Sequence, residues 1–89
     1  MRKLSVHKSA IKELRDLQPK EYRQVVTSMF DLLTNPEPHN SKQLQGSEYR
    51  RLAVGEFRVV YRMDGECVYI VACGRRNDGA VYEFLGRKI

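Results

Sequence analysis

A two-residue Asp64-Gly65 step between two apolar runs limits most strongly what this chain can fold into. Both residue types tolerate a positive φ, which the tightest hairpin loops require. Apolar residues alternate at period two in residues 57–63, before the step, whereas residues 67–73, after it, are apolar almost throughout. The sequence therefore predicts an antiparallel strand pair whose second strand is central and covered on both faces.

The residues before this hairpin predict another strand. Apolar residues at 52 and 54 alternate with Arg51 and Ala53, and Gly55-Glu56 makes a tight connection to the next strand. Because successive side chains in a strand point to opposite faces, we expect Arg51 on the face away from the core. Arg58 is expected on that same face of the next strand. Residues 80–85 form a last short element whose type the pattern leaves open.

The N-terminal half changes from strand to helix periodicity. Residues 3–6 suit a short strand, and apolar residues then recur at spacings of three and four in 8–17 and in 19–33. Pro19 separates two helices, because the residue before proline is displaced from helical geometry while proline suits a first helical turn. The short turn predicts an antiparallel helical hairpin, followed by a loop over 35–47. The apolar stripe of the second helix is expected to belong to the core rather than to a cofactor site, and it consists of Tyr22, Val25, Val26, Met29, Phe30 and Leu33.

These elements predict one α+β domain over residues 1–89. An N-terminal strand and an antiparallel helical hairpin pack on one face of a mainly antiparallel four-stranded sheet. A content of 42% hydrophobic and 30% charged residues is typical of a globular chain. There is no apolar run of about 18 residues, so no membrane span is expected, and the polar residues after Met1 predict no secretory leader.

The chain is basic, with 16 Lys and Arg against 11 Asp and Glu and a formal net charge of +5. Residues 1–45 carry 8 basic and 5 acidic side chains and residues 46–89 carry 8 and 6, so there is no basic tail. A basic surface predicts a polyanionic partner, and folding must assemble that surface. Arginines on exposed strands are common, so a solvated face without function is the alternative.

Neither the cysteines nor the histidines indicate a metal or a cofactor. Cys67 and Cys73 lie about 20 Å apart if they share one strand, well beyond the ~7 Å reach of a disulfide. We expect free thiols in a reducing cytoplasm. His7 and His39 are isolated, and no CxxC spacing occurs, so no metal site is expected. His7 is expected to cap a helix or lie on the surface, and His39 to be exposed to solvent.

Two motifs resemble those of the RelE/ParE superfamily of toxins. The first is Leu44-x-Gly46 followed by the run Tyr49 to Arg62 (YRRLAVGEFRVVYR), and the second is Gly74-Arg75-Arg76 followed by Val81-Tyr82. With the helical hairpin ahead of them, the resemblance covers essentially the whole chain. It implies a cytoplasmic toxin of a type II toxin–antitoxin pair, with a sheet like that of microbial RNases.

The resemblance implies two activities. RelE members cleave mRNA in the ribosomal A site without metal, whereas ParE members poison DNA gyrase. RelE members use a basic residue on the second strand, an arginine on the third, and an arginine and a tyrosine near the end. The residues in these places, and hence the expected catalytic residues, are Arg51, Arg58, Arg76 and Tyr82. We expect the endoribonuclease; a ParE-like gyrase inhibitor without nuclease activity is the alternative, and an inactive or purely nucleic-acid-binding relative is a third.

The resemblance also implies further contacts and partners. The superfamily often has a second basic residue two positions after the first, and this position is Ala53 here, with Arg50 or Arg62 as a possible substitute. The expected RNA-binding residues are Arg50, Arg62, Arg75 and Lys42. The expected partners are the ribosome, mRNA and a cognate antitoxin in a hetero-oligomer. A helical antitoxin segment would cover exposed apolar surface or displace the C-terminal element.

Metal-free cleavage needs a base for the 2′-hydroxyl, cations for the phosphorane and a proton for the 5′-oxygen. The constellation has no histidine, so Tyr82 is the expected base. Its ordinary pKa near 10 must then be lowered by nearby cations, the role expected of Arg58 and Arg76. Glu48 and Glu56 are alternative bases, although their neighbours indicate turn positions. Attack by the 2′-hydroxyl would make the reaction specific for RNA.

The first helix carries Lys8, Lys12 and Arg15 together with Glu13 and Asp16. Mixed charges of this kind are typical of an ordinary solvated helix face. Contact with ribosomal RNA is the alternative.

Overall fold

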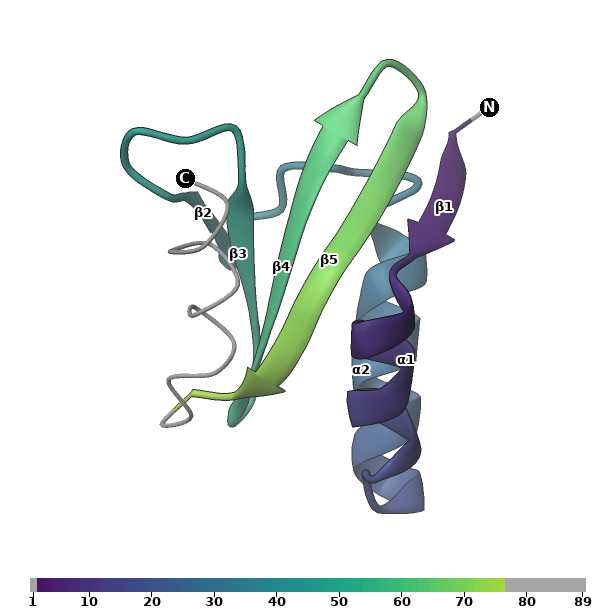
Figure 1. Ribbon diagram of the computed structural model, residues 1–89. Coiled ribbons are helices and arrows are strands. Elements are labelled where there is room, and N and C mark those ends of the chain that lie inside the picture. Colours follow the sequence, from purple (N-terminus) through teal and green to yellow (C-terminus); the bar gives the residue numbers. More distant parts are fainter. Residues whose placement is uncertain (1, 77–89) are drawn as a thin grey trace.

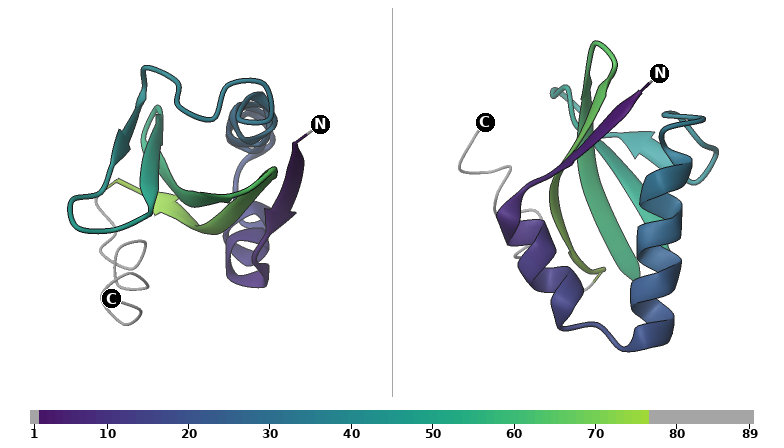
Figure 2. Two further views of the ribbon diagram at one scale, coloured as in Figure 1. Left: turned by 90° about the horizontal axis from the view of Figure 1, so that it is seen from above. Right: turned by 90° about the vertical axis from the view of Figure 1, so that its right-hand side faces the viewer.

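The computed structural model describes residues 2–76 of the 89. Two helices lie on one side of a five-stranded sheet (Figures 1 and 2). The elements in chain order are β1 (Lys3–Val6), α1 (Lys8–Arg15), α2 (Pro19–Asp31), β2 (Ser41–Gln43), β3 (Arg50–Val54), β4 (Phe57–Asp64) and β5 (Cys67–Arg75). Tyr82 and the element expected over 80–85 lie outside the described residues.

The sheet is mainly antiparallel, as predicted, but it has five strands rather than four. Its order is β1-β5-β4-β3-β2, and only the pairing of β1 with β5 is parallel. The prediction of a loop over 35–47 is wrong for Ser41–Gln43, which pairs with β3. The Asn40 side chain donates to the Ala53 carbonyl at 2.8 Å, and the Ala53 amide donates back to the Asn40 carbonyl at 3.0 Å. These bonds between distant segments hold β2 beside β3. The sequence of β2 has no apolar alternation, so the local pattern did not predict this strand.

Both β-hairpins form where the sequence predicts them, with one shift in register. Val54 pairs with Phe57 across a Gly55-Glu56 loop, as predicted. Asp64 instead ends β4 and pairs with Cys67, so the second loop is Gly65-Glu66 and not Asp64-Gly65. Only the glycine of each loop has a positive φ, +58° at Gly55 and +60° at Gly65. Glycine adopts this conformation without steric cost, which makes it the residue that sets each turn.

The main core lies between the helices and the sheet. His7 caps α1 by accepting a hydrogen bond from the Ser9 amide at 3.1 Å, as predicted, and Pro19 begins α2. The buried residues of this core are Ala10, Leu14, Val25, Met29 and Leu32 from the helical layer and Leu52, Phe57, Val59, Tyr61, Val68, Ile70 and Cys73 from the sheet. The helical hairpin is therefore fixed against β3, β4 and β5.

A smaller cluster covers the opposite face of the sheet, here called the outer face. It contains Val60, Val71 and Ala72, with Leu44, Tyr49 and Tyr69 packed against it. Val60 pairs with Ala72 whereas Tyr61 pairs with Ile70, so Val71 is an extra residue in β5. This bulge increases local twist and separates the two ends of the outer face. The prediction that β5 is apolar on both faces is confirmed.

The prediction that the whole α2 stripe is core is wrong at two residues. Tyr22 and Phe30 are 45% and 54% exposed, and Ile11 of α1 is 39% exposed. The sheet covers only the Val25 and Met29 side of α2. The exposed side chains line an apolar groove of about 320 Å³ between the two helices and β1, with Leu4, Val6, Leu14, Arg15, Val26 and Met29.

None of the helices within residues 2–76 is long and apolar enough to cross a membrane. Both cysteines are free thiols, as predicted, and His39 is exposed, as predicted.

Candidate nucleic-acid interface

The sheet register places Arg51 and Arg58 on the outer face. Arg51 pairs with Val60, a residue of the outer cluster, and Arg58 pairs with Ala53, which lies two residues after Arg51 and therefore on the same face of β3. Both arginines are half-buried. The two cations thus emerge diagonally from adjacent strands, with the small Ala53 side chain between them.

Arg58 is anchored at the turn between β3 and β4. Its Nη1 donates to the Gly55 carbonyl at 3.0 Å and to the Phe57 carbonyl at 2.8 Å. These acceptors are neutral, so the guanidinium keeps its full charge while its position is restricted. Its other nitrogen atoms make no hydrogen bond or ion pair within residues 2–76.

Arg76 is held at the same turn. Its backbone amide donates to the Glu56 carbonyl at 2.7 Å, and its Nε lies 3.4 Å from Glu56 Oε2. Glu56 therefore occupies the turn position that its neighbours indicated, and its carboxylate lies against the guanidinium of Arg76. Sequence reasoning missed this contact, although the Gly55-Glu56 step marked the turn.

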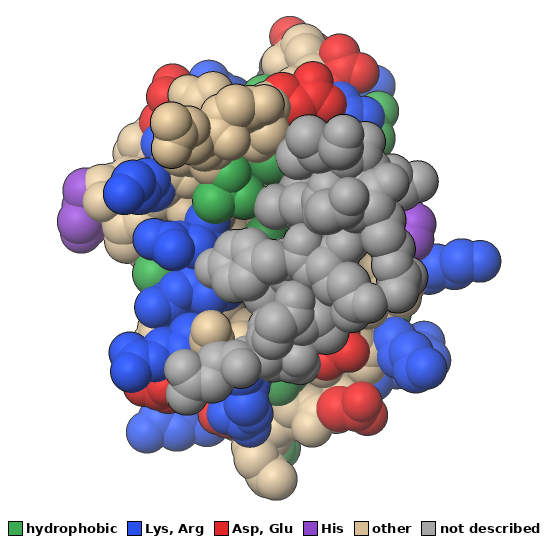
Figure 3. Space-filling model, turned by 60° about the vertical axis from the view of Figure 1, so that its left-hand side comes forward, with side chains coloured by type: hydrophobic (Ala, Val, Ile, Leu, Met, Phe, Trp, Pro, Cys, Tyr) green, Lys and Arg blue, Asp and Glu red, His purple; other side chains and the backbone are tan. Residues whose placement is uncertain are grey.

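Lys42 of β2 pairs directly with Arg51 of β3. Like charges directly opposite each other in an antiparallel pair destabilise the sheet. Neither side chain makes an ion pair or a hydrogen bond in the described part of the chain. A bound anion would relieve this repulsion, and Figure 3 shows Lys and Arg side chains gathered along the side of the molecule that carries β2 and β3.

Arg50 lies on the helix side of the sheet. It shares its side of β3 with Leu52, its Nη2 donates to Ser41 Oγ at 2.9 Å, and its Nη1 lies 3.3 Å from Glu37 Oε1. Its Nε is buried without a hydrogen-bond partner. Tyr61 holds the same loop, because its hydroxyl donates to the Pro36 carbonyl at 2.7 Å. Arg50 therefore braces the loop before β2.

Arg75 and Arg62 are also placed apart from Arg58. Arg75 pairs with Phe57, stacks 4.8 Å over its ring, and lies 3.7 Å from Glu21 of α2, all on the helix side. Arg62 is on the outer face beyond the bulge, 4.5 Å over the Tyr69 ring. Its nearest carboxylates are those of Glu48 and Asp64, at 3.8 and 3.9 Å. Neither Arg50 nor Arg62 therefore fills the place of a basic residue at position 53.

Tyr69 on the outer face has a shifted pKa, and the shift is unfavourable for a base. The pKa of Tyr69 is raised above 10.0, chiefly by its side-chain hydrogen bond with Cys67, then by the charge of Cys67 and by burial. A phenol with a raised pKa stays protonated near neutral pH. Tyr69 is thus not suited to remove a proton from a hydroxyl group.

Burial, together with a smaller contribution from the charge of Glu13, raises the pKa of the Cys73 thiol from an ordinary value of 9.0 to about 11. The Sγ also donates to the Ala10 carbonyl at 3.5 Å. Because the folded-state pKa is raised, this thiol's contribution to stability is complete below pH 9.0 and is lost as the pH rises toward about 11.

We expect iodoacetamide to alkylate Cys73 at least about tenfold more slowly than Cys67 in the folded protein at about pH 8.5, because only the thiolate reacts. Mass spectrometry of timed samples measures both rates. The control is the chain unfolded in urea, in which the two rates should converge. Equal rates in the folded protein would contradict the buried thiol.

The described residues contain no group of three or more His, Cys, Asp or Glu side chains arranged to hold a metal ion. The groups on the outer face that can bind a charged ligand are its cations. They suit a phosphodiester, because guanidinium groups donate paired hydrogen bonds to phosphate oxygens.

The family model for the ParE toxin of type II toxin–antitoxin systems, parDE, matches residues 4–79. This span contains both helices, nearly all of the sheet and the cations of the outer face. The chain belongs to the ParE toxin family. A candidate toxin named RelE1 from Methanocaldococcus jannaschii is 37% identical over 80 residues, covering 83% of this chain and 89% of the relative. Membership of the RelE/ParE superfamily, which the motifs indicated, is thus confirmed.

Solved structures of RelE toxins share the fold of this ParE-family chain. The archaeal RelE–RelB complex from Pyrococcus horikoshii matches with a TM-score of 0.77 and 23% identity, covering 85% of this chain and 96% of the other. A mutant of the E. coli toxin RelE in the free state matches with a TM-score of 0.81 and 21% identity, covering 99% and 97%. The RelBE2 toxin–antitoxin complex from Mycobacterium tuberculosis matches with a TM-score of 0.75 and 25% identity, covering 84% and 98%.

Proposed function

We propose that this toxin is a ribosome-dependent endoribonuclease that cleaves mRNA in the A site and thereby stops translation in the cytoplasm. The observation that carries the proposal is the outer face, where Arg51 and Arg58 emerge from adjacent strands and Arg76 is held at the same turn as Arg58. Two guanidiniums on one face, with a third at the adjoining turn, suit a phosphodiester undergoing attack. Similarity to RelE toxins supports this activity.

Each cation has a proposed role in the reaction. Arg58 and Arg76 neutralise the charge that develops on the phosphorane as the 2′-oxygen attacks and the bond to the 5′-oxygen breaks. Tyr82 is the proposed base that takes the 2′-hydroxyl proton, and the departing 5′-oxygen takes a proton from solvent water. Arg51 and Lys42 bind the RNA backbone, and an anionic phosphate between them would offset their mutual repulsion.

The remaining basic residues divide between RNA and the fold. Arg62 is on the outer face, so it remains a proposed RNA contact beyond the bulge. Arg50 and Arg75 are paired with carboxylates on the helix side. We therefore propose that these two arginines stabilise the loop before β2 and the packing of α2. Their effect on RNA binding is then indirect, through the positions of that loop and of α2.

The experiment that tests the activity is expression of the toxin alone, followed by mapping of the 5′ ends of cellular mRNA. Cuts within coding regions that keep a fixed position relative to the reading frame are expected, because the ribosome presents the mRNA codon by codon. Intact messages would overturn the proposal.

The second candidate is inhibition of DNA gyrase without nuclease activity. The matching family model is that of ParE toxins, and Ala53 stands where RelE-like members often have a basic residue. Intact messages together with broken, gyrase-linked DNA in the same cells would support this candidate. Normal growth with intact RNA and DNA would indicate an inactive or purely nucleic-acid-binding relative.

The proposed protein partner is a cognate antitoxin. Several of the structural neighbours are RelE toxins solved together with RelB antitoxins. Here, Ile11, Tyr22 and Phe30 leave an apolar groove open between the helices and β1. An amphipathic helix suits such a groove, because its apolar side chains enter at helical spacing. We propose that a helical segment of the antitoxin occupies it and that the two proteins form a hetero-oligomer.

Phe30→Asp should weaken antitoxin binding by at least about tenfold, because it places a charge on the apolar wall of the groove. Isothermal titration calorimetry with the cognate antitoxin measures the Kd. The matched control is Thr27→Asp, an exposed position of α2 that does not line the groove. An unchanged Kd for Phe30→Asp would place the antitoxin elsewhere.

A further inference from the structure

Two tyrosines and an arginine form a row across the outer face, beyond the β5 bulge. Arg62 of β4 pairs directly with Tyr69 of β5, and its guanidinium carbon lies 4.5 Å from the centroid of the Tyr69 ring. Tyr49 stands two residues before Arg51, and it packs against the same outer cluster as Tyr69. All three side chains of this stacking row, Tyr49, Arg62 and Tyr69, are half-buried, so each keeps part of its surface open to a ligand.

The charges around the stacking row do not suit a phosphate. Arg62 lies 3.8 Å from Glu48 Oε1 and 3.9 Å from Asp64 Oδ2, and both carboxylates are exposed. One guanidinium and two carboxylates carry a net charge of −1, so a phosphate placed there would meet net repulsion. At the other end of the outer face, by contrast, Arg51 and Arg58 make no ion pair within residues 2–76.

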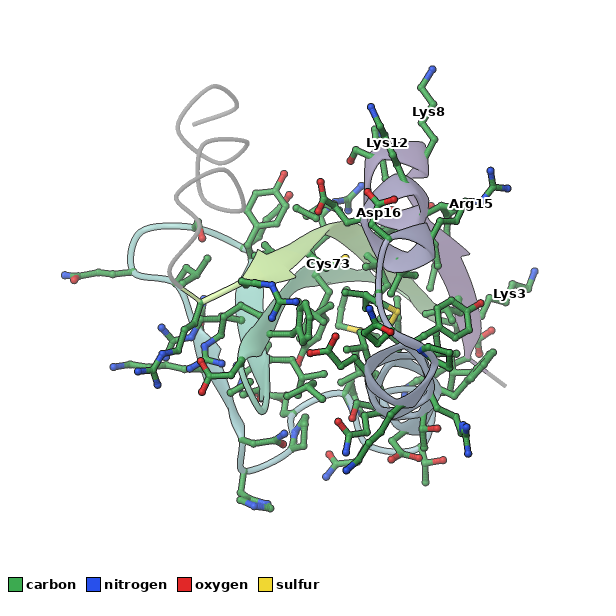
Figure 4. All side chains as sticks on the ribbon, turned by 90° about the horizontal axis from the view of Figure 1, so that it is seen from below. Lys3, Lys8, Lys12, Arg15, Asp16 and Cys73 are labelled. Atoms are coloured by element: carbon green, nitrogen blue, oxygen red, sulfur yellow. The ribbon has the colours of Figure 1, made fainter. Side chains whose placement is uncertain are left out.

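Basic residues near the other edge of the sheet are separate from this row. Figure 4 shows Lys3 at the β1 edge, and Lys8, Lys12 and Arg15 of α1, extending outward from the molecule. These elements lie on the far side of β5 from β3 (Figure 1). The chemistry of the row is therefore that of two aromatic rings, one guanidinium and two carboxylates.

We propose that the stacking row binds an unpaired nucleobase of the RNA strand whose backbone the cations at the other end of the outer face hold. Unpaired bases stack on aromatic rings and on guanidinium planes, and this contact needs no phosphate. Arg62 lies two residues along β4 from Val60, the partner of Arg51, so the stacking row is about 7 Å from Arg51 along the strand. A base next to the bound phosphate spans that distance. The inference rests on the proposed function in taking RNA as the ligand of this face.

The two carboxylates select which base binds. Their distances from Arg62 exceed that of a hydrogen bond, so Glu48 and Asp64 keep their oxygen atoms available as acceptors. A carboxylate accepts hydrogen bonds and donates none. Cytosine, adenine and guanine carry an exocyclic amino group that donates to it, whereas uracil presents a single N–H between two carbonyl oxygens that a carboxylate repels. We therefore expect the stacking row to favour amino-bearing bases over uracil.

The first test compares labelled hexacytidine with labelled hexauridine, two single strands of equal charge whose pyrimidine rings are of the same size. Fluorescence anisotropy measures the Kd of the full-length protein for each strand, without ribosomes. We expect hexacytidine to bind at least about fivefold more tightly, the effect of one hydrogen bond to a charged acceptor. Glu48→Gln/Asp64→Asn should remove this preference, because an amide also donates to a carbonyl oxygen.

The second test separates base stacking from phosphate binding. Tyr69→Leu should raise the Kd for hexacytidine by at least about fivefold, because it removes a stacking surface. The slope of log Kd against log salt should stay that of the wild type, because no phosphate contact is lost. Tyr69→Phe retains the ring and should restore the wild-type Kd. Arg51→Gln should instead reduce the slope by about 0.7, the value for one phosphate contact on a single strand.

Equal Kd values of the wild type for the two strands, or no binding of either strand, would overturn the proposal. So would a wild-type Kd for Tyr69→Leu, or a weaker binding that Tyr69→Phe shares. The mRNA mapping separates this result from the proposed function. Row-dependent binding of hexacytidine with intact messages retains the stacking row and removes the nuclease, and mRNA cleavage with equal binding of the two strands does the reverse.

Discussion

Replacing Arg58 with alanine should lower the single-turnover rate of mRNA cleavage on programmed ribosomes by about 10²–10³-fold, the usual effect of removing one preorganised donor to a developing oxyanion. Arg58 is held by two backbone carbonyls on the outer face, so its charge reaches the phosphate with little loss of conformational entropy. The measurement is the rate of appearance of the cleaved 5′ end, with ribosomes in excess over message.

Two further variants make this result specific. Arg58→Lys retains the charge but loses the paired donors, so it should recover part of the rate. Tyr82→Phe in the same assay tests the proposed base. The Arg58→Ala protein should unfold at nearly the temperature of the wild type, because the lost contacts are to carbonyls at an exposed turn. A cleavage rate within about threefold of wild type would remove Arg58 from the reaction.

Met29→Ala should lower the free energy of unfolding by about 2–5 kcal/mol, because truncating a buried side chain loses its burial energy and leaves a cavity. Met29 is 2% exposed and lies in the main core between α2 and the sheet. Domains of this size are stable by about 5–15 kcal/mol, so the change removes a large share of the total. Urea denaturation monitored by circular dichroism measures it.

The matched control is Phe30→Ala on the next residue of α2. Phe30 is 54% exposed, so its truncation should change the free energy of unfolding by less than about 1 kcal/mol. A similar loss in both variants would show that Phe30 belongs to the core. A small loss at Phe30 together with weaker antitoxin binding would separate the docking surface from the fold.

Local patterns predicted the elements and part of the candidate site. The helical spacing and Pro19 defined the hairpin, and strand alternation placed Arg51 and Arg58 on the face away from the core. The same alternation places Arg50 on the helix side. The pattern could therefore have shown that Arg50 and Arg51 lie on opposite faces, but the sequence prediction did not use it in this way. The face on which Arg75 lies could not be predicted in this way, because only the pairing of Arg75 with Phe57 shows that β5 continues past Gly74.

What the sequence by itself determined is periodicity: which residues form helices and strands, and which side chains alternate. The physical reason is that backbone dihedral preferences and side-chain direction are properties of neighbouring residues. The tertiary structure alone decided the β2 pairing, the open groove at Tyr22 and Phe30, and the Glu56–Arg76 contact. Each of these depends on which distant segment lies alongside, and no local pattern specifies that.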